Sequence, residues 1–466
     1  MSKISSKWLV VFAVLFGTFT VILNNSMLNP VLPEFMYIFD SDAVGVSWIL
    51  TIFMIAMGMT MPLTGFLGDR FGKKKVYLIG LVLFMTGSIL GALSQTLWMV
   101  ITARAVQGMA GGLMMPNAMA LIFNAFPKNE RGFAIGVYGV SVMVAPAIGP
   151  TIGGVIAENF AWEFLFLFNI PFALLSLFFS TKYLKPTESN PALRFDWKGF
   201  ALITAGVGSV LYVLGQGREF EALLNVSNIG LFILGAILIF VFIKYELKRD
   251  EPLLDLSVFK IKTYRYSIIV TSAASIGLFS GLFLLPYMIQ EAFEMGLVRT
   301  GLIFLPSALM SGVFMSIGGR LLDKKGPRVV IPTGLMILAS ASLALGFVEL
   351  STSYWVLMAI YIVHGSGLGF ANMPATTAGM NKIPENLVAQ GSAMNNLIRQ
   401  ISSSFGIVFF SVYYEIRRGQ LQLLEEISTQ EATMQAINEA FIVAAVILVL
   451  AVPFAFKMKG FDEKEE

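Results

Sequence analysis

The chain of 466 residues has no cysteine and one histidine, and only 13% of its residues are charged. Without cysteine there is no disulfide, thiolate metal site or thiol nucleophile, and one histidine excludes a multi-histidine metal centre. We therefore expect neither a metal nor a cofactor. Soluble proteins carry about 25% charged residues, so roughly half of the usual charge is missing. With 56% hydrophobic residues and a mean hydropathy of +0.76, the composition excludes a soluble enzyme, a nucleic-acid binder and a disordered chain.

What the chain does contain is a series of long apolar runs. A run of about 20 apolar residues crosses a bilayer as a helix. The polar stretch 415–436 is too short to fold alone, and we expect it to be an amphipathic surface helix or a solvated loop. The chain is thus predicted to be an all-α integral membrane protein with 14 transmembrane helices, at roughly 8–30, 44–67, 75–94, 97–122, 132–157, 163–182, 198–217, 226–246, 265–290, 298–320, 328–349, 353–377, 390–414 and 437–457.

Lysine and arginine are distributed unequally between the two sides of these predicted helices. If the N-terminus is cytoplasmic, 26 of the 32 basic residues lie in cytoplasmic segments. Cytoplasmic loops of membrane proteins carry an excess of Lys and Arg. We therefore predict a multi-pass protein of the cell membrane with both termini in the cytoplasm. The four basic residues on the other side are Arg218, Arg299, Arg417 and Arg418.

Short motifs recur in the two halves of the chain at offsets of 254 to 257 residues. The aligned pairs are Asp69 with Asp323, Gly108 with Gly365 and Gly112 with Gly369. Such matches predict a duplication, with six-helix bundles in residues 1–190 and 251–466 and an inserted helix pair in residues 191–250. Duplicated bundles that move about a central site are typical of transporters.

Several motifs also carry a family resemblance. Gly65–Lys75 resembles the helix 2–3 signature of the major facilitator superfamily, Leu97–Gly108 resembles its fourth-helix motif, and Gly149–Gly154 resembles its fifth-helix antiporter motif. With 14 apolar runs, the chain is similar to the 14-helix drug:proton antiporters of the EmrB/QacA type. The resemblance implies that the protein is not an enzyme and that it exports hydrophobic drugs in exchange for protons by alternating access. The sequence also lacks a phosphate-binding Gly-x4-Gly-Lys-Ser/Thr loop, which argues for secondary transport and against transport driven by ATP.

The expected partners are small lipophilic substrates, protons and membrane lipid, with no nucleic acid, and the expected functional unit is a monomer. A dedicated exporter of a metabolite or lipid would use the same scaffold. A membrane sensor without transport is a more remote alternative, because no ligand-binding or signalling domain is visible in the sequence.

The gating residues that we expect lie at helix ends and helix crossings. Asp69 is placed to meet the N-terminus of a neighbouring helix or Arg131, and such a contact would latch one conformation. Glycines and prolines in the fifth predicted helix would allow close approach and a kink. The set is Gly65, Asp69, Arg70, Gly72, Arg131, Gly149, Pro150, Gly153 and Asp323.

Arg104 lies inside the fourth predicted helix, where a cation is costly and marks a functional site. In the family the position of Asn24 is usually an aspartate that pairs with such an arginine and exchanges protons. An amide does not titrate, and no Asp or Glu lies deep in a predicted helix. Proton coupling is therefore predicted for His364, near mid-membrane, or for Glu291 or Glu34, which closure at the outer helix ends would bury.

A polar patch on facing helices is expected to line a central cavity that Arg104 and His364 face. The predicted substrate-binding residues are Asn25, Asn29, Arg104, Gln107, Asn117, His364 and Asn372. Because no acid lies deep in a predicted helix, we expect neutral, zwitterionic or weakly charged lipophilic substrates rather than dications.

Overall fold

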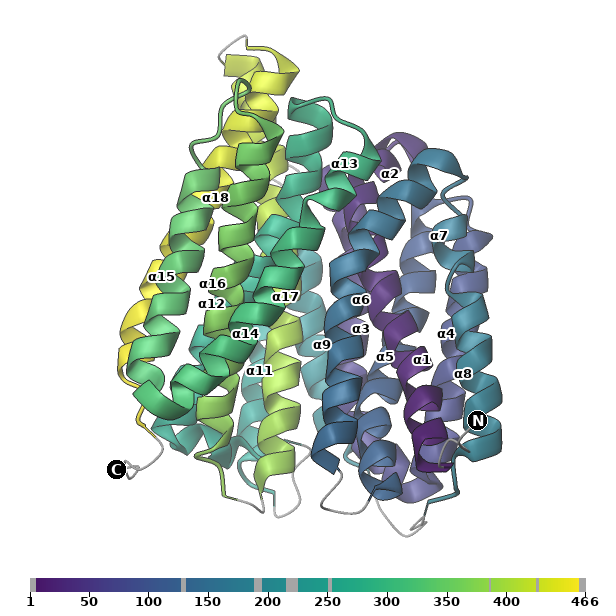
Figure 1. The fold of residues 1–466 in the computed structure, drawn as a ribbon. Helices are drawn as coiled ribbons and strands as arrows, with labels where there is room; N and C mark the ends of the chain where they lie inside the picture. Colours follow the sequence, from purple (N-terminus) through teal and green to yellow (C-terminus); the bar gives the residue numbers. More distant parts are fainter. Residues whose placement is uncertain are drawn as a thin grey trace.

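The computed structural model describes most of the chain, and the part it describes is helical, without a strand. The helices lie side by side, and both termini are at the same end of the molecule (Figure 1). We call this end the termini face and the opposite end, where α2, α7 and α13 lie, the far face. The described residues are 6–126, 131–187, 195–214, 225–249, 254–384, 387–424 and 427–460.

The first part of the chain, through residue 187, forms one group of helices. They are α1 (Ser6–Met27), the short 3-10 turn η1 (Asn29–Val31), α2 (Leu32–Ile38), α3 (Ala43–Phe71), α4 (Lys73–Ala92), α5 (Leu97–Ala125), α6 (Arg131–Asn159), α7 (Phe164–Leu167) and α8 (Ile170–Tyr183). Two further helices, α9 (Trp197–Leu214) and α11 (Val226–Glu246), pack against each other.

The remaining helices form a second group. They are η2 (Leu256–Lys260), α12 (Lys262–Tyr287), the π-turn η3 (Met288–Ala292), α13 (Leu297–Leu302), α14 (Phe304–Lys325), α15 (Pro327–Leu345), α16 (Tyr354–Met380), α17 (Val388–Leu424) and α18 (Thr429–Phe456).

Each predicted run coincides with a helix or with consecutive helices. Eleven spans in the described residues are long and apolar enough to cross a membrane. The helices α5, α6 and α17, of 29, 29 and 37 residues, correspond to the other three predicted runs. The all-α membrane architecture is confirmed. One predicted boundary is wrong: α17 continues to Leu424 and includes Arg417 and Arg418, so these residues lie neither in a solvated loop nor in a separate surface helix.

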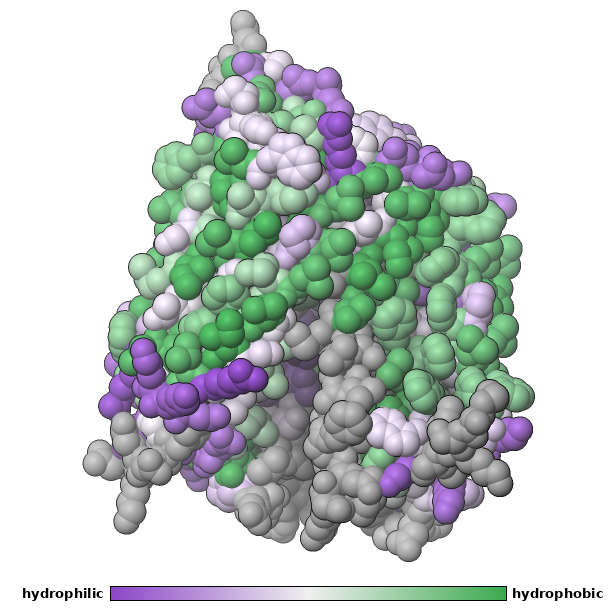
Figure 2. Space-filling view, viewed as in Figure 1, coloured by the Kyte–Doolittle hydropathy of each residue, from purple (hydrophilic) through white to green (hydrophobic). Residues whose placement is uncertain are grey.

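The surface of the molecule matches this architecture. Figure 2 shows a broad hydrophobic band with polar residues gathered toward the two ends. The helix α11 carries exposed Phe232, Ile233, Ile237 and Phe240 along its length. Apolar side chains exposed in this number are stable against lipid and not against water.

The aligned glycines make the same contact in both groups of helices. A Cβ atom at any of them would overlap or crowd a backbone carbonyl oxygen of the neighbouring helix, so only glycine permits these crossings. The contacts join α5 to α3 and α16 to α14, and they pair Gly108 with Phe53, Gly112 with Met57, Gly365 with Ser307 and Gly369 with Ser311. The aligned loops also both reverse at a glycine of positive φ, Gly72 (93°) and Gly326 (75°).

The two groups of helices meet along two seams. At one seam α6 packs against α13 and α14, and at the other α3 packs against α17. The helix α9 lies over the second seam, where Val207 joins an apolar cluster with Ile55 of α3 and Leu397 of α17. The space between the two seams holds the candidate site.

Candidate functional site

A cavity of 330 Å³ lies between the two groups of helices, bounded by α1 and α6 on one side and by α12, α14 and α16 on the other. Its wall is mostly apolar, with Phe279 and Phe304 among the larger side chains. None of the described residues that line it is charged. The polar lining residues are Asn25, Ser26, Asn29, Ser307, Ser311, Tyr361 and His364.

Three of the seven predicted substrate-binding residues line this cavity: Asn25, Asn29 and His364. Arg104 and Gln107 are fully buried behind its wall, where Gln107 donates a hydrogen bond to Ser88 of α4 at 3.0 Å. The expectation that Arg104 itself faces the cavity is therefore not met in this conformation.

The other two predicted residues, Asn117 on α5 and Asn372 on α16, lie away from the cavity wall. Asn117 donates to the carbonyl oxygen of Leu113, and its side-chain oxygen faces Gly68 at the termini end of α3. Asn372 is half-buried on α16 and does not line the cavity. Tyr361, Ser307 and Ser311 are polar lining residues that were not predicted. The sequence signal for the two serines is indirect, because they contact the aligned glycines Gly365 and Gly369.

Arg104 is held by four neutral hydrogen-bond acceptors. Its guanidinium donates to the side-chain oxygens of Asn24 at 2.6 Å, Gln107 at 2.9 Å and Asn25 at 2.7 Å, and to the carbonyl oxygen of Ile49 at 3.1 Å. The ring of Phe53 lies 4.1 Å from the guanidinium carbon. No carboxylate of the described chain pairs with it, so a full positive charge is buried beside the cavity without a counterion.

Replacing Asn24 by aspartate is expected to stabilise the protein. The change is nearly isosteric and places a carboxylate at the 2.6 Å contact with Arg104. A buried charge without a partner costs about 3 kcal/mol relative to a paired one, so the melting temperature of purified Asn24→Asp should rise by several degrees. Asn24→Leu, which removes the hydrogen bond, should lower it. A melting temperature of Asn24→Asp at or below that of the wild type would contradict this account.

His364 lies 1% exposed in the wall of the cavity. Its ring stacks on Tyr361, with centroids 5.0 Å apart, and it hydrogen-bonds the backbone of Gly277 on α12. The Nε2 atom is buried and has no partner. His364 is therefore packed into the cavity wall, where α16 meets α12.

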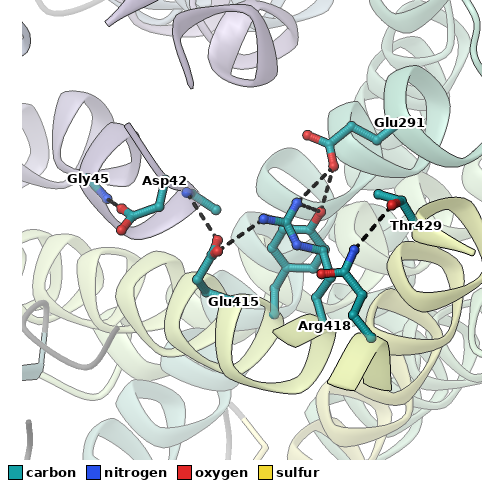
Figure 3. A network of polar contacts seen from close by, with 9 residues as sticks. Asp42, Gly45, Glu291, Glu415, Arg418 and Thr429 are labelled. Carbon is teal, nitrogen blue, oxygen red and sulfur yellow. Dashed lines mark hydrogen bonds and ion pairs between the residues drawn. The ribbon is translucent and has the colours of Figure 1, made fainter. Parts of the chain in front are cut away.

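A second polar cluster lies at the far face, where Glu291 meets α17 (Figure 3). The Oε2 atom of Glu291 accepts hydrogen bonds from Tyr414 at 2.8 Å and Arg418 at 3.1 Å. Arg418 also donates to Glu415 at 3.0 Å, and Glu415 accepts from the backbone N–H of Ala43 at the start of α3 at 3.2 Å. Two carboxylates thus share one arginine, and the second of them caps a helix of the other group.

The position of Glu291 follows from the local sequence. Pro286 lacks a backbone N–H and interrupts the hydrogen bonds of α12. The chain then passes into the π-turn η3, which contains Glu291. Its Oε1 atom is buried without a partner, and the neighbouring hydroxyl of Tyr287 is buried without a partner as well. The third proton-coupling candidate, Glu34, is exposed on α2.

Further contacts join the two groups of helices near the far face. Thr151 of α6 donates to the carbonyl oxygen of Gly301, and the carboxylate of Glu158 accepts from the backbone N–H of Val298 at 2.8 Å. Gln290 donates to the carbonyl oxygen of Pro30. A Cβ atom at Gly154 would overlap the carbonyl oxygen of Leu297. Together with the Ala43 contact, these hold the far face closed.

The predicted gating residues of the Asp69 loop lie at the termini face. Asp69 is exposed and forms an ion pair with Lys73 at 3.6 Å, and Arg70 lies over the rings of Phe66 and Phe71. Gly72 turns the chain, after which the N–H of Lys73 donates to Thr187 at 2.6 Å.

The other predicted gating residues differ in how closely they are packed. A Cβ atom at Gly149 or Gly153 would overlap α1, and Pro150 contacts Gly301 through its carbonyl oxygen. Gly65 has open space around it, and Asp323 is exposed. The side chain of Arg131 lies outside the described residues, so its predicted contact with Asp69 stays a prediction.

A bundle of long apolar helices around a cavity shared by its two groups defines a multi-pass membrane transporter. The comparison with protein families agrees with this class. The model of the Major Facilitator Superfamily matches residues 14–407, and the chain belongs to that superfamily.

Relatives and solved structures extend this result. The chain is 31% identical to the uncharacterized MFS-type transporter YhcA of Bacillus subtilis, over 86% of this chain and 75% of that one. It is 29% identical to the lincomycin resistance protein LmrB of Listeria monocytogenes over 85% and 84%, and 26% identical to the riboflavin transporter RibZ of Clostridioides difficile over 97% and 98%. Its fold resembles that of a bacterial homologue of the human lysosomal transporter Spinster, with a TM-score of 0.69, 15% identity and 98% of each chain covered.

Proposed function

We propose that this transporter exports lipophilic compounds of neutral, zwitterionic or weakly charged character in exchange for protons. Residues 1–190 and 251–466 would act as two bundles that alternate about the cavity, with the pair in residues 191–250 covering one seam. The termini face would be cytoplasmic, as the distribution of Lys and Arg predicts. Relatives named for multidrug transport and for lincomycin resistance support export of this kind.

The observation that carries the proposal is the 330 Å³ cavity itself. It is built from both groups of helices, so relative movement of the groups changes its shape and its access. Its apolar and aromatic wall suits lipophilic molecules, and the neutral polar groups of Asn25 and Asn29 orient them. The closed far face makes this the conformation that would load substrate from the termini face.

Glu291 is our proposed proton carrier. It is a buried carboxylate at the far face, and it is bonded to Arg418, which also holds the residue that caps α3. A proton on Glu291 would remove one of the two negative charges that share Arg418 and would leave that arginine to Glu415. Proton binding is thereby linked to the contact between the two groups of helices. His364 is the alternative carrier, and its packed position makes it the weaker one.

Liposomes that contain the purified protein test this function. With a proton gradient imposed, the wild type should move a fluorescent lipophilic substrate against its concentration gradient. Protons should move in the opposite direction only when that substrate is present. Glu291→Gln should reduce the proton movement to the level of protein-free liposomes, because an amide cannot carry the proton. Glu439→Gln is the matched control: this far-face carboxylate is also paired with an arginine, Arg417, at 2.6 Å, but it lies outside the cluster of Glu291.

The variants Glu291→Gln and His364→Ala test the two candidate proton carriers. Full coupling in both Glu291→Gln and His364→Ala would contradict both site assignments. Transport that is insensitive to the proton gradient in the wild type would contradict the antiport mechanism.

Export of one metabolite is the second candidate function. The likeness to the riboflavin transporter RibZ, over nearly the full length of both chains, favours it. A panel of unrelated lipophilic compounds in the same liposomes separates the two functions. A multidrug exporter moves many of them, whereas a dedicated exporter moves one chemical type.

A further inference from the structure

Arg104 carries a buried positive charge that no carboxylate of the described residues balances. Arg104 has only neutral partners, as described above. Arg399 on α17 is half-buried and does not line the cavity; its guanidinium donates to Asn396 at 3.1 Å, and no carboxylate of the described chain pairs with it. The Asp and Glu side chains that the structure describes lie toward the two faces of the molecule. The cavity beside Arg104 therefore lies in a positive electrostatic potential, which low-dielectric surroundings strengthen.

Asn25 extends the charge of Arg104 into the cavity. An arginine has only hydrogen-bond donors, so the side-chain oxygen of Asn25 must be the atom that faces it, at 2.7 Å. The NH2 group of the same amide is then left for the cavity, which Asn25 lines. The amide dipole is aligned with its positive end toward the cavity. A ligand meets a hydrogen-bond donor that is polarised by a buried cation directly behind it.

We propose that the cavity selects molecules that place a carboxylate or another strong hydrogen-bond acceptor at Asn25, and that it rejects organic cations. The charge of Arg104, relayed by Asn25, is the cause of this selectivity. The proposal rests on the proposed function, because it names the substrate class of the same cavity. Lipophilic weak acids and uncharged carbonyl compounds are the ligands that fit, with the acceptor toward α1 and the apolar body toward Phe279 and Phe304.

Three dansyl compounds with one fluorophore and different charge test the proposal on the purified full-length protein. Dansylglycine is an anion, dansylamide is neutral and dansylcadaverine is a cation, and the fluorescence of each rises in an apolar site. The wild type should bind dansylglycine about tenfold more tightly than dansylcadaverine, with dansylamide between them. Equal affinity for the anion and the cation, binding of the cation alone, or binding of none of the three would overturn the proposal.

Asn24→Asp changes the potential without touching the wall of the cavity. Asn24 is fully buried and does not line the cavity, so the substitution acts through the charge of Arg104. In this variant the ratio of the two affinities should fall close to one, and an unchanged ratio would overturn the proposal. Asn159→Asp adds the same charge at the exposed end of α6 and should leave the ratio as in the wild type.

Binding and transport separate this proposal from the proposed function. Proton-driven export of dansylamide without any preference for dansylglycine over dansylcadaverine would leave the exporter in place and overturn the charge selectivity. A tenfold preference for the anion in a protein that transports none of the probes in response to a proton gradient would support the charge selectivity and overturn the proposed export function.

Discussion

Gly154→Val is expected to abolish transport. A Cβ atom at this position of α6 would overlap the carbonyl oxygen of Leu297, and a backbone oxygen inside a packed helix pair cannot move aside. The two groups of helices would then be unable to close at the far face, while each group keeps its own packing. Transport in liposomes should fall to background. Spin labels at the exposed far-face positions Tyr37 and Phe347 should report a longer distance than in the wild type.

The chain provides good controls for this experiment. It has no cysteine, so two introduced cysteines are the only labelled sites. Gly230→Val makes the same substitution on α11, where a Cβ atom would meet open space, and it should transport like the wild type. Gly301→Val disrupts the same contact between α6 and α13 from the α13 side, because its Cβ atom would overlap the carbonyl oxygen of Pro150. Normal transport by Gly154→Val would show that this seam does not have to close.

The helices were predictable because the bilayer sets their length. Each apolar run of about 20 residues corresponds to one helix or to consecutive helices, and the motif spacing located the glycine crossings of α5 and α16. The end of α17 was not predictable in this way. Its last turns contain Glu415, Arg417 and Arg418, and polar residues normally end a membrane helix. Here they are paired with one another and with Glu291 and Glu439, and hydropathy does not detect such pairing.

The sequence predicted only part of the cavity lining, because it gives the depth of a residue along a helix but not the direction of its side chain. The sequence places Arg104 and Asn24 at similar depth, and the structure joins them. Gln107 and His364 directly precede the aligned glycines Gly108 and Gly365, and both are predicted to bind substrate in the same cavity. The structure turns Gln107 toward Ser88 and leaves only His364 in the wall. Depth along a helix can be counted from the sequence, whereas the direction of a side chain around the helix depends on which neighbours it packs against.

Arg418→Gln is expected to destabilise the protein and to weaken closure of the far face. The substitution leaves Glu291 and Glu415, whose side chains are 8% and 18% exposed, without the cation that they share. Removing one member of a buried ion pair costs about 3 kcal/mol, because the remaining charge is uncompensated. The melting temperature should fall by several degrees. The distance between spin labels at Tyr37 and Phe347 should shift toward the open state, since Glu415 is no longer held against Ala43.

A second substitution distinguishes this account from a simple loss of packing. In Arg418→Gln/Glu291→Gln one of the two unpaired carboxylates is gone, so part of the lost stability should return even though a further native contact has been removed. If packing alone matters, the double variant should be less stable than Arg418→Gln. Partial recovery of stability would show that the unpaired charge of Glu291, and not lost packing, destabilises Arg418→Gln, as the ion pair between Arg418 and Glu291 predicts.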